Sequence, residues 1–223
     1  MSSTALCLTA LLLLIPIFIS YKEGLHIIKD LVIATIRAAI QLIILGFLLH
    51  YIFKINEKWL LMICVLVIII NASWNTISRA SPVMHHVFWI SFVAIFVGTA
   101  LPLAGTIATG AIKFTANEVI PIGGMLANNG LIAINLAYQN LDRAFVQDIS
   151  GIESKLTLAA TPKLASKSSI RESIRLAIVP TIDSVKTYGL VSIPGMMTGL
   201  IIGGVPPLPV SYTHLTLPTI CSV

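Results

Sequence analysis

The sequence predicts an all-α membrane protein, a bundle of about six membrane-spanning helices. Of its 223 residues 57% are hydrophobic and only 10% are charged, whereas a soluble domain carries about a quarter charged residues. The apolar residues also gather in segments close to the roughly 20 residues that a helix needs to cross a bilayer. We therefore interpret residues 1–209 as one transmembrane domain.

The first expected span, residues 2–21, contains no charged residue. A cleaved signal peptide is the alternative, but such a peptide has a basic N-terminal region and a small-residue cleavage site. Here the first lysine is Lys22, and no cleavage site of that kind follows. We therefore expect this segment to stay in the membrane as a span.

Five more spans are expected along the chain. Pro82 and Pro102 should trim or kink the fourth of all the spans, because proline lacks the amide hydrogen that a helix interior uses. The spans expected after the first are 38–53, 59–78, 83–112, 119–141 and 187–205.

The lysines and arginines predict the orientation of these spans. If the N-terminus lies outside, eleven of the fourteen Lys and Arg residues fall in cytoplasmic segments. Cytoplasmic loops of membrane proteins carry such an excess of positive charge. We therefore expect the N-terminus outside a bacterial inner membrane and the polar segment 142–186 in the cytoplasm.

The segment 142–186 gathers much of the charge of an otherwise apolar chain. Cations recur in it at every fourth position: Lys163, Lys167, Arg171 and Arg175. Isoleucines share that spacing: Ile170, Ile174 and Ile178. Residues four apart lie on one face of a helix, so the segment predicts an amphipathic helix with an apolar face and a basic edge. The pattern leaves two roles open, contact with anionic lipid of the inner leaflet or docking to another protein.

Catalytic and metal-binding motifs are absent from the sequence. A phosphate-binding loop needs G-x-x-x-x-G-K-[ST], and the nearest match has Ala111 after Gly110. The adjacent His85 and His86 would point in different directions on a helix, so no metal site is assigned, and no nucleic-acid partner is expected. All the acidic residues lie in loops or near span ends. This weakens the alternative of a secondary transporter, and an intramembrane enzyme would need a nucleophile–base pair that the spans lack.

Glycine, proline, asparagine and methionine recur together within the spans, as in VIPIGGMLANNG (119–130). The glycines Gly195, Gly199 and Gly203 would let a neighbouring helix approach closely. Two interpretations of the amides remain open, because buried amides join helices or line a substrate path. Amide and thioether groups that line such a path would make transient contacts with a soft metal ion as it crosses the membrane. The residues assigned to a candidate translocation path are Asn71, Asn75, Met125, Asn128, Asn129, Pro194, Gly195, Met196 and Met197.

Several blocks of the sequence strongly resemble the bacterial FetB family, and the likeness covers most of residues 20–205. These blocks are NASWN (71–75), VIPIGGMLANN (119–129), ESKLTLAATPKLAS (153–166) and IRESIRLAIVPTIDSVKTYGLVSIPGMMTGLI (170–201). Members of the family are permease subunits of an ABC exporter implicated in iron efflux and oxidative-stress resistance, and plant aluminium-tolerance proteins share the domain. The resemblance implies a permease without enzymatic activity of its own, in a bilayer, exporting a metal ion. It further implies two permease copies with two FetA-type ATPase subunits, which bind the ATP and Mg²⁺.

The resemblance also assigns a role to the polar segment. ABC permeases carry a cytoplasmic loop similar to E-A-A-x-x-x-G, whose helix docks into a groove of the ATPase subunit. Glu153 matches the glutamate, and Ala159 stands where the glycine would be, so a turn with positive φ there would strain the alanine. The residues assigned to coupling are Glu153, Leu158, Ala159, Thr161, Pro162, Lys163, Lys167, Arg171 and Arg175.

The C-terminal part departs from the resemblance. The family continues past residue 205 with a polar turn and one more span. This chain instead contains VSYTHLTLPT (210–219), which looks unrelated to the family. We therefore expect residues 210–223 to be a non-native tail.

Overall fold

The computed structural model describes residues 14–24, 28–55, 57–80, 84, 86–187 and 204. It divides into two compact units, Met1–Ile55 and Asn56–Val223, and each is described by itself. Within the described residues all regular secondary structure is α-helical, and four helices are long and apolar enough to cross a membrane. This confirms the all-α membrane class.

The first unit contains helix α2, Leu14–Lys22, in contact with helix α3, Ile28–Ile55. Helix α3 begins at Ile28 rather than at residue 38, where the second span was expected, so it includes Lys29, Asp30 and Arg37. The early start has a local cause, since Asp30 lies in the first turn, where a negative charge favours a helix. The first expected span is described only from residue 14 onward.

The second unit begins with three long apolar helices: α4, Lys58–Ile77; α5, Val87–Ala108; and α6, Ala116–Gln147. Helix α4 lies within one residue of the expected span at both ends. Helix α5 continues through the buried Pro102 and stops at Ala108. It ends close to Gly110, which has a φ of 72°, a backbone conformation that glycine adopts readily. Pro82 and most of the expected span 187–205 lie outside the described residues.

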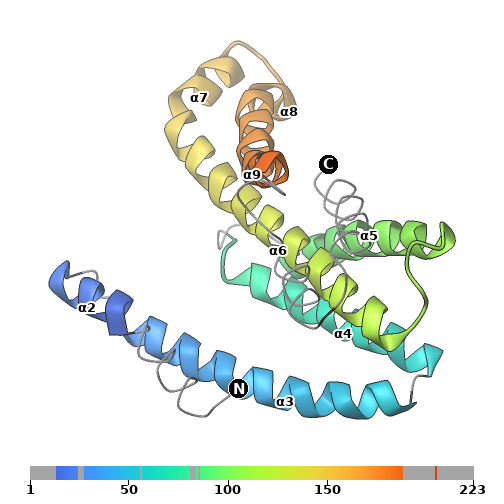
Figure 1. Ribbon diagram of the computed structural model, residues 1–223. Helices are drawn as coiled ribbons and strands as arrows, with labels where there is room; N and C mark the ends of the chain where they lie inside the picture. Colours follow the sequence, from blue (N-terminus) through green and yellow to red (C-terminus); the bar gives the residue numbers. More distant parts are fainter. Residues whose placement is uncertain are drawn as a thin grey trace. The chain divides into compact units, whose positions relative to one another are not determined.

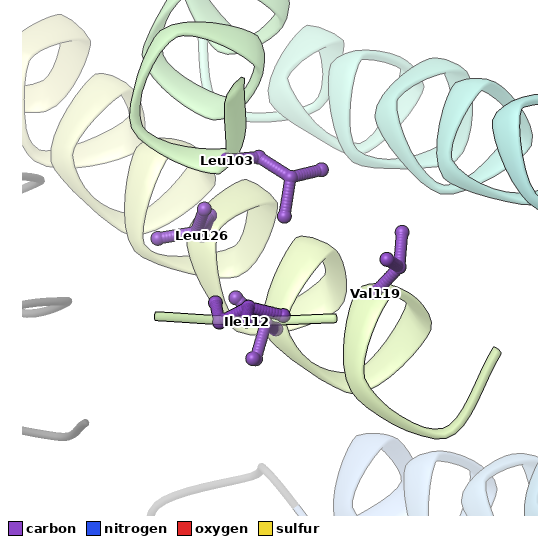
Figure 2. Close-up of a cluster of buried hydrophobic side chains, with 5 residues drawn as sticks. Leu103, Ile112, Val119 and Leu126 are labelled. Carbon is purple, nitrogen blue, oxygen red and sulfur yellow. The ribbon is translucent and has the colours of Figure 1, made fainter. Parts of the chain in front are cut away.

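Helix α6 is the centre of the second unit and contacts α4, α5 and a later helix, α9 (Figure 1). One cluster of buried side chains joins α5, the following turn and α6: Leu103, Ile112, Val119, Ile122 and Leu126 (Figure 2). A second cluster joins α4 to α5 and α6: Ile69, Ala72, Ile95 and Ala127. These clusters hold the three long helices together.

Small residues allow the close approach of α6 to its neighbours. A Cβ on Gly123 would lie 3.2 Å from Cγ2 of Val65 on α4, so alanine there would require the Val65 side chain to shift by a few tenths of an ångström. Near the other end of the α5–α6 contact, the hydroxyls of Ser91 and Tyr138 are hydrogen-bonded at 2.9 Å. This bond satisfies both polar groups within the apolar bundle.

Tryptophan marks both ends of α4. Trp59 and Trp74 are 62% and 68% exposed, and they lie about 22 Å apart along the helix at 1.5 Å per residue. Trp74 packs edge-on against Phe88 near the start of α5, with ring centroids 6.1 Å apart. Trp is enriched at both membrane–water interfaces. The positions of these rings therefore indicate that α4 spans the apolar layer.

Three shorter or more polar helices follow α6. They are α7, Ile149–Thr157; α8, Pro162–Ala165; and α9, Lys167–Thr187. Helix α6 has 32 residues, more than the roughly 20 that a bilayer crossing needs. We therefore expect its last turns to extend beyond the membrane, where α9 packs back against α6.

Candidate functional site

The polar segment folds back along α6 through a seam of small side chains. Helix α9 packs beside α6 (Figure 1), and the buried residues on this side recur at every fourth position: Ala165, Ser169, Ser173 and Ala177. Small residues let two helix backbones approach closely. The hydroxyl of Ser173 donates to the carbonyl oxygen of Ser169 at 2.7 Å, so its burial leaves no unpaired polar group.

The apolar face expected of α9 is therefore not the face that packs inside this chain. Ile170 and Ile174 are 38% and 51% exposed, and Leu164 of α8 is 60% exposed. Hydrophobic spacing identifies an apolar face but does not say which face meets a neighbouring helix. The isoleucines are left available for contact outside the described residues.

These exposed apolar residues and three cations line a shallow groove on α8 and α9. We call its lining the coupling surface: Thr161, Lys163, Leu164, Lys167, Ile170, Arg171 and Ile174. An apolar floor edged by cations is suited to a partner that is apolar at the centre and acidic around it. The structure thus brings Lys163, Lys167 and Arg171 to one place, as the basic stripe predicted.

A polar network fixes this surface to the end of α6. The hydroxyl of Ser169 donates to Oδ2 of Asp148 at 3.0 Å, and Nζ of Lys155 lies 3.8 Å from the same oxygen. Lys155 Nζ also donates to the carbonyl oxygen of Ala165 at 3.4 Å and to the hydroxyl of Ser168 at 3.2 Å. The ion pair is about two-fifths exposed and stabilises little by itself. The network as a whole matters because it holds the end of α6 and helices α7, α8 and α9 in fixed positions relative to one another.

Gly151 leaves room for this network. A Cβ at position 151 would overlap Oδ1 of Asp148 and lie 3.3 Å from its Cγ. Any other residue would therefore turn the Asp148 carboxylate away from its present position. The sequence patterns did not single out Asp148, Lys155 or Ser169. The one signal available was the four-residue spacing of small residues, which includes Ser169.

The turn after α7 has the conformation that the resemblance assigned to a glycine. Ala159 has a φ of 63°. Its N–H donates to the carbonyl of Leu156 and the N–H of Ala160 donates to that of Lys155, both at 3.0 Å, which closes the helix in a Schellman motif. A left-handed conformation costs an L-residue about 1–2 kcal/mol. Ala159 therefore bears the strain that the loop pattern predicted for this position.

The next turn starts α8. Thr161 is extended, with φ −67° and ψ 149°, and Pro162 occupies the first helical position. Proline suits that position because its missing N–H has no helical partner there and its φ is already helical. The carbonyl of Thr161 then accepts from the N–H groups of Leu164 and Ala165, both at 2.9 Å. This turn presents Lys163 and Leu164 to the groove.

The other residues assigned to coupling lie around the groove rather than in its lining. Glu153 is exposed on α7, and Leu158 at the turn is 82% exposed. Arg175 forms an exposed pair with Glu172 at 3.9 Å on α9. Their roles in coupling stay predictions.

The candidate translocation path falls on several faces. Nδ2 of Asn75 donates to the carbonyl and side-chain oxygens of Asn71, both at 2.9 Å, on the exposed side of α4. On α6, Met125 packs against the cluster of Figure 2, Asn128 is exposed and Asn129 is half-buried. Pro194, Gly195, Met196 and Met197 lie outside the described residues. Among the residues that are described, no group of three His, Cys, Asp or Glu side chains could hold a metal ion.

Comparison with known proteins decides the family. The model of the uncharacterised protein family UPF0014 matches residues 3–221. The chain belongs to this family. It is 45% identical to the "Probable iron export permease protein FetB" of Escherichia coli K12, over 93% of this chain and 80% of the relative. This confirms the resemblance to the FetB family.

Two further relatives show how widely the UPF0014 family occurs. The chain is 34% identical to the "UPF0014 membrane protein YjkA" of Bacillus subtilis 168, over 93% of this chain and 83% of the relative. It is 28% identical to "Protein ALUMINUM SENSITIVE 3" of Arabidopsis thaliana, over 87% of this chain and 71% of the relative. No solved structure matches the chain. With its apolar helices, the chain is a membrane protein related to a permease.

Proposed function

We propose that this chain is the permease subunit of an ABC exporter and moves a metal ion, driven by a separate cytoplasmic ATPase subunit. The observation that carries the proposal is the coupling surface. Leu164, Ile170 and Ile174 expose apolar area beside Lys163, Lys167 and Arg171, in a groove with no occupant among the described residues. An ATPase subunit with an acidic rim and an apolar centre would fill it.

The packing of α9 favours a protein partner over a lipid surface. A helix that lies flat on a leaflet buries its apolar face in the headgroup region. Helix α9 instead runs beside α6, a helix long enough to cross the membrane. Helix α9 is therefore held beside the end of α6, and its exposed isoleucines are not laid flat on the bilayer surface.

The polar network supports a role in transmitting movement. A push on the coupling surface reaches α6 directly through Ser169 and Asp148, which are 3.0 Å apart. Helix α6 is in turn packed against α4 and α5. ATP-driven closure of the partner would therefore tilt the packed helices together and alternate access to the path.

The name of the Escherichia coli relative supports iron as the exported ion. The amide and thioether groups of the candidate path, Asn71, Asn75, Met125, Asn128 and Asn129, suit an ion that passes without being held. If the chain lies in the bacterial inner membrane with its N-terminus outside, the coupling surface is in the cytoplasm, where ATP is available. We place two permease copies and two FetA-type ATPase subunits in the assembly.

The test is metal uptake into inverted membrane vesicles that contain this chain and its ATPase subunit. Uptake of iron should need ATP and both proteins, because this chain is proposed to lack an ATP-binding site of its own. Other divalent ions tested singly would give the selectivity. ATP-independent uptake that follows an ion gradient, with the ATPase subunit absent, would instead support the alternative, a secondary transporter.

A further inference from the structure

A groove on the second unit is lined by apolar side chains alone. It lies between α4, α5 and the first turns of α6, and its volume is about 430 Å³, within the roughly 300–1,000 Å³ of sites that hold small molecules. We call it the apolar groove, and its lining includes Met62, Leu66, Ile69, Phe96, Leu103 and Val119. Leu103 and Val119 are also part of the cluster in Figure 2. The lining offers no group that would bind a polar substrate, so whatever occupies the groove is apolar there.

Alanine on α5 keeps the groove open. Ala100 and Ala104 both line it, and residues four apart share one face of a helix. Met62 and Phe96 belong to the lining, yet they remain 67% and 43% exposed. The three long helices therefore leave a hollow where larger side chains would have packed against one another, and no side chain of the described residues fills it.

The groove extends along one half of the bilayer rather than across it. On α4 its lining runs from Met62 to Ile69, and the exposed Trp59 marks the membrane–water interface just before it. The rise from Lys58 to Ile69 is about 17 Å at 1.5 Å per residue, close to half of the roughly 30 Å hydrocarbon layer. A helix that crosses the membrane would need a groove about twice as long, whereas a lipid tail occupies one leaflet.

The groove lies toward the end of the bundle at which α4 and α6 begin. Gly123 of α6 lies beside Val65 of α4, and Ala127, four residues later, packs in one cluster with Ile69. The two helices therefore run in the same direction and in step. This places Lys58, the first residue of α4, level with the first turn of α6.

Lys58 and Lys113 provide positive charge at this end. Both are exposed, and Lys113 immediately precedes Phe114, which lines the groove. Neither ammonium group forms an ion pair with a residue that the structure describes. The carboxylate of Glu118 accepts a hydrogen bond from the N–H of Lys113 at 2.7 Å, and Glu57 is exposed beside Lys58. This set is complementary to a zwitterionic lipid headgroup, with its phosphate at the two lysines and its ammonium group at Glu57.

We infer that the apolar groove binds one acyl chain of a bilayer phospholipid whose phosphate lies at Lys58 and Lys113. Lipid tails are as apolar as the groove, so leaving the bulk lipid gives the chain no hydrophobic gain. Close contact within the hollow and the charged headgroup retain it instead. The bound chain completes the packing between α4 and α5, which places a lipid among the helices of this domain.

The experiment uses the full chain in vesicles of phosphatidylethanolamine and phosphatidylglycerol. A trace of phosphatidylethanolamine carries a photoreactive diazirine on one acyl chain, and mass spectrometry locates the lipid adducts after irradiation. Ala104→Phe fills the groove with a side chain of this protein. The matched control is Ala94→Phe, the same change at an exposed position of α5 outside the groove.

Adducts should gather on Met62 and Phe96 and exceed those on Val97, which is 45% exposed and outside the groove. In Ala104→Phe the groove adducts should fall to the yield at Val97, and in Ala94→Phe they should be unchanged. Equal yields at groove and Val97 in the unaltered chain would mean ordinary surrounding lipid. A groove free of adducts would mean that a protein segment fills it. Either result overturns the inference.

A second variant tests the headgroup and leaves the packing of the helices unchanged, should Ala104→Phe fail to accumulate. Lys58→Ala combined with Lys113→Ala should lower the groove adducts about threefold, because exposed charged contacts are worth little individually. An undiminished yield would contradict the placing of the phosphate at these lysines. The assay needs neither ATP nor the ATPase subunit, so its result is separate from that of the transport test.

Discussion

A chain carrying both Lys167→Glu and Arg171→Glu should lose the ATPase subunit. Both side chains are exposed in the coupling surface, so the change leaves the packing of α9 intact and places negative charge where the partner is expected to be acidic. Losing one partner of a charge pair that becomes buried at an interface costs about 2–5 kcal/mol, and 2 kcal/mol corresponds to about a 30-fold change in affinity. Recovery of the ATPase subunit with tagged permease from detergent-solubilised membranes should fall by about that factor or more.

The matched control is Lys186→Glu, on the same helix but outside the groove. Lys186 is exposed and pairs with Asp183 at 3.1 Å, so its replacement changes the charge of α9 in the same direction. Loss of an exposed pair is worth about 0–1 kcal/mol, and recovery should stay near that of the unaltered chain. If the doubly reversed chain recovers as much ATPase subunit as this control, the partner does not bind at the coupling surface.

Ser173→Leu should leave the ATPase subunit bound and stop transport. Ser173 is 2% exposed in the seam between α6 and α9, and inserting a larger side chain into a packed interior costs about 1–3 kcal/mol. Helix α9 would separate from α6 while Lys163, Lys167 and Arg171 stay on the surface. Recovery of the ATPase subunit should therefore change little, whereas ATP-driven metal uptake into inverted vesicles should fall at least about tenfold.

Glu172→Leu is the control for this variant, because it adds the same side chain at the neighbouring exposed position. It should retain uptake. Limited trypsin digestion gives an independent readout, since the lysines and arginines of α9 should be cut faster in Ser173→Leu than in Glu172→Leu. Normal uptake by Ser173→Leu would mean that the α6–α9 seam does not transmit the movement.

The elements with clear hydrophobic boundaries could be predicted from the sequence. Helix α4 matches its expected span because charged and polar residues flank one apolar run of the required length. The helical nature of α9 followed from the spacing of its cations and isoleucines. The start of α3 was less clear, since Lys29, Asp30 and Arg37 resemble a loop although they continue the helix.

The packing around α9 could not be predicted in the same way. Serine counts as polar in any hydropathy pattern, so hydropathy did not indicate that Ser169 and Ser173 are buried. Their partner, α6, is close only because the chain turns back at Asp148 and again at Ala159, and the network at Asp148 depends on that turn. The resemblance indicated both the position of Ala159 and a turn of positive φ there, and the folded chain has that φ.

The most direct test of the central claim is the side of the membrane on which the turn before the coupling surface lies. Leu158→Cys places a thiol at an 82% exposed position, in the chain whose three native cysteines are replaced by serine. A membrane-impermeant maleimide should label it in inverted vesicles, more slowly once the ATPase subunit is bound, and should leave it unlabelled in intact cells. Labelling in intact cells would place the coupling surface outside, where no cytoplasmic ATPase could reach it.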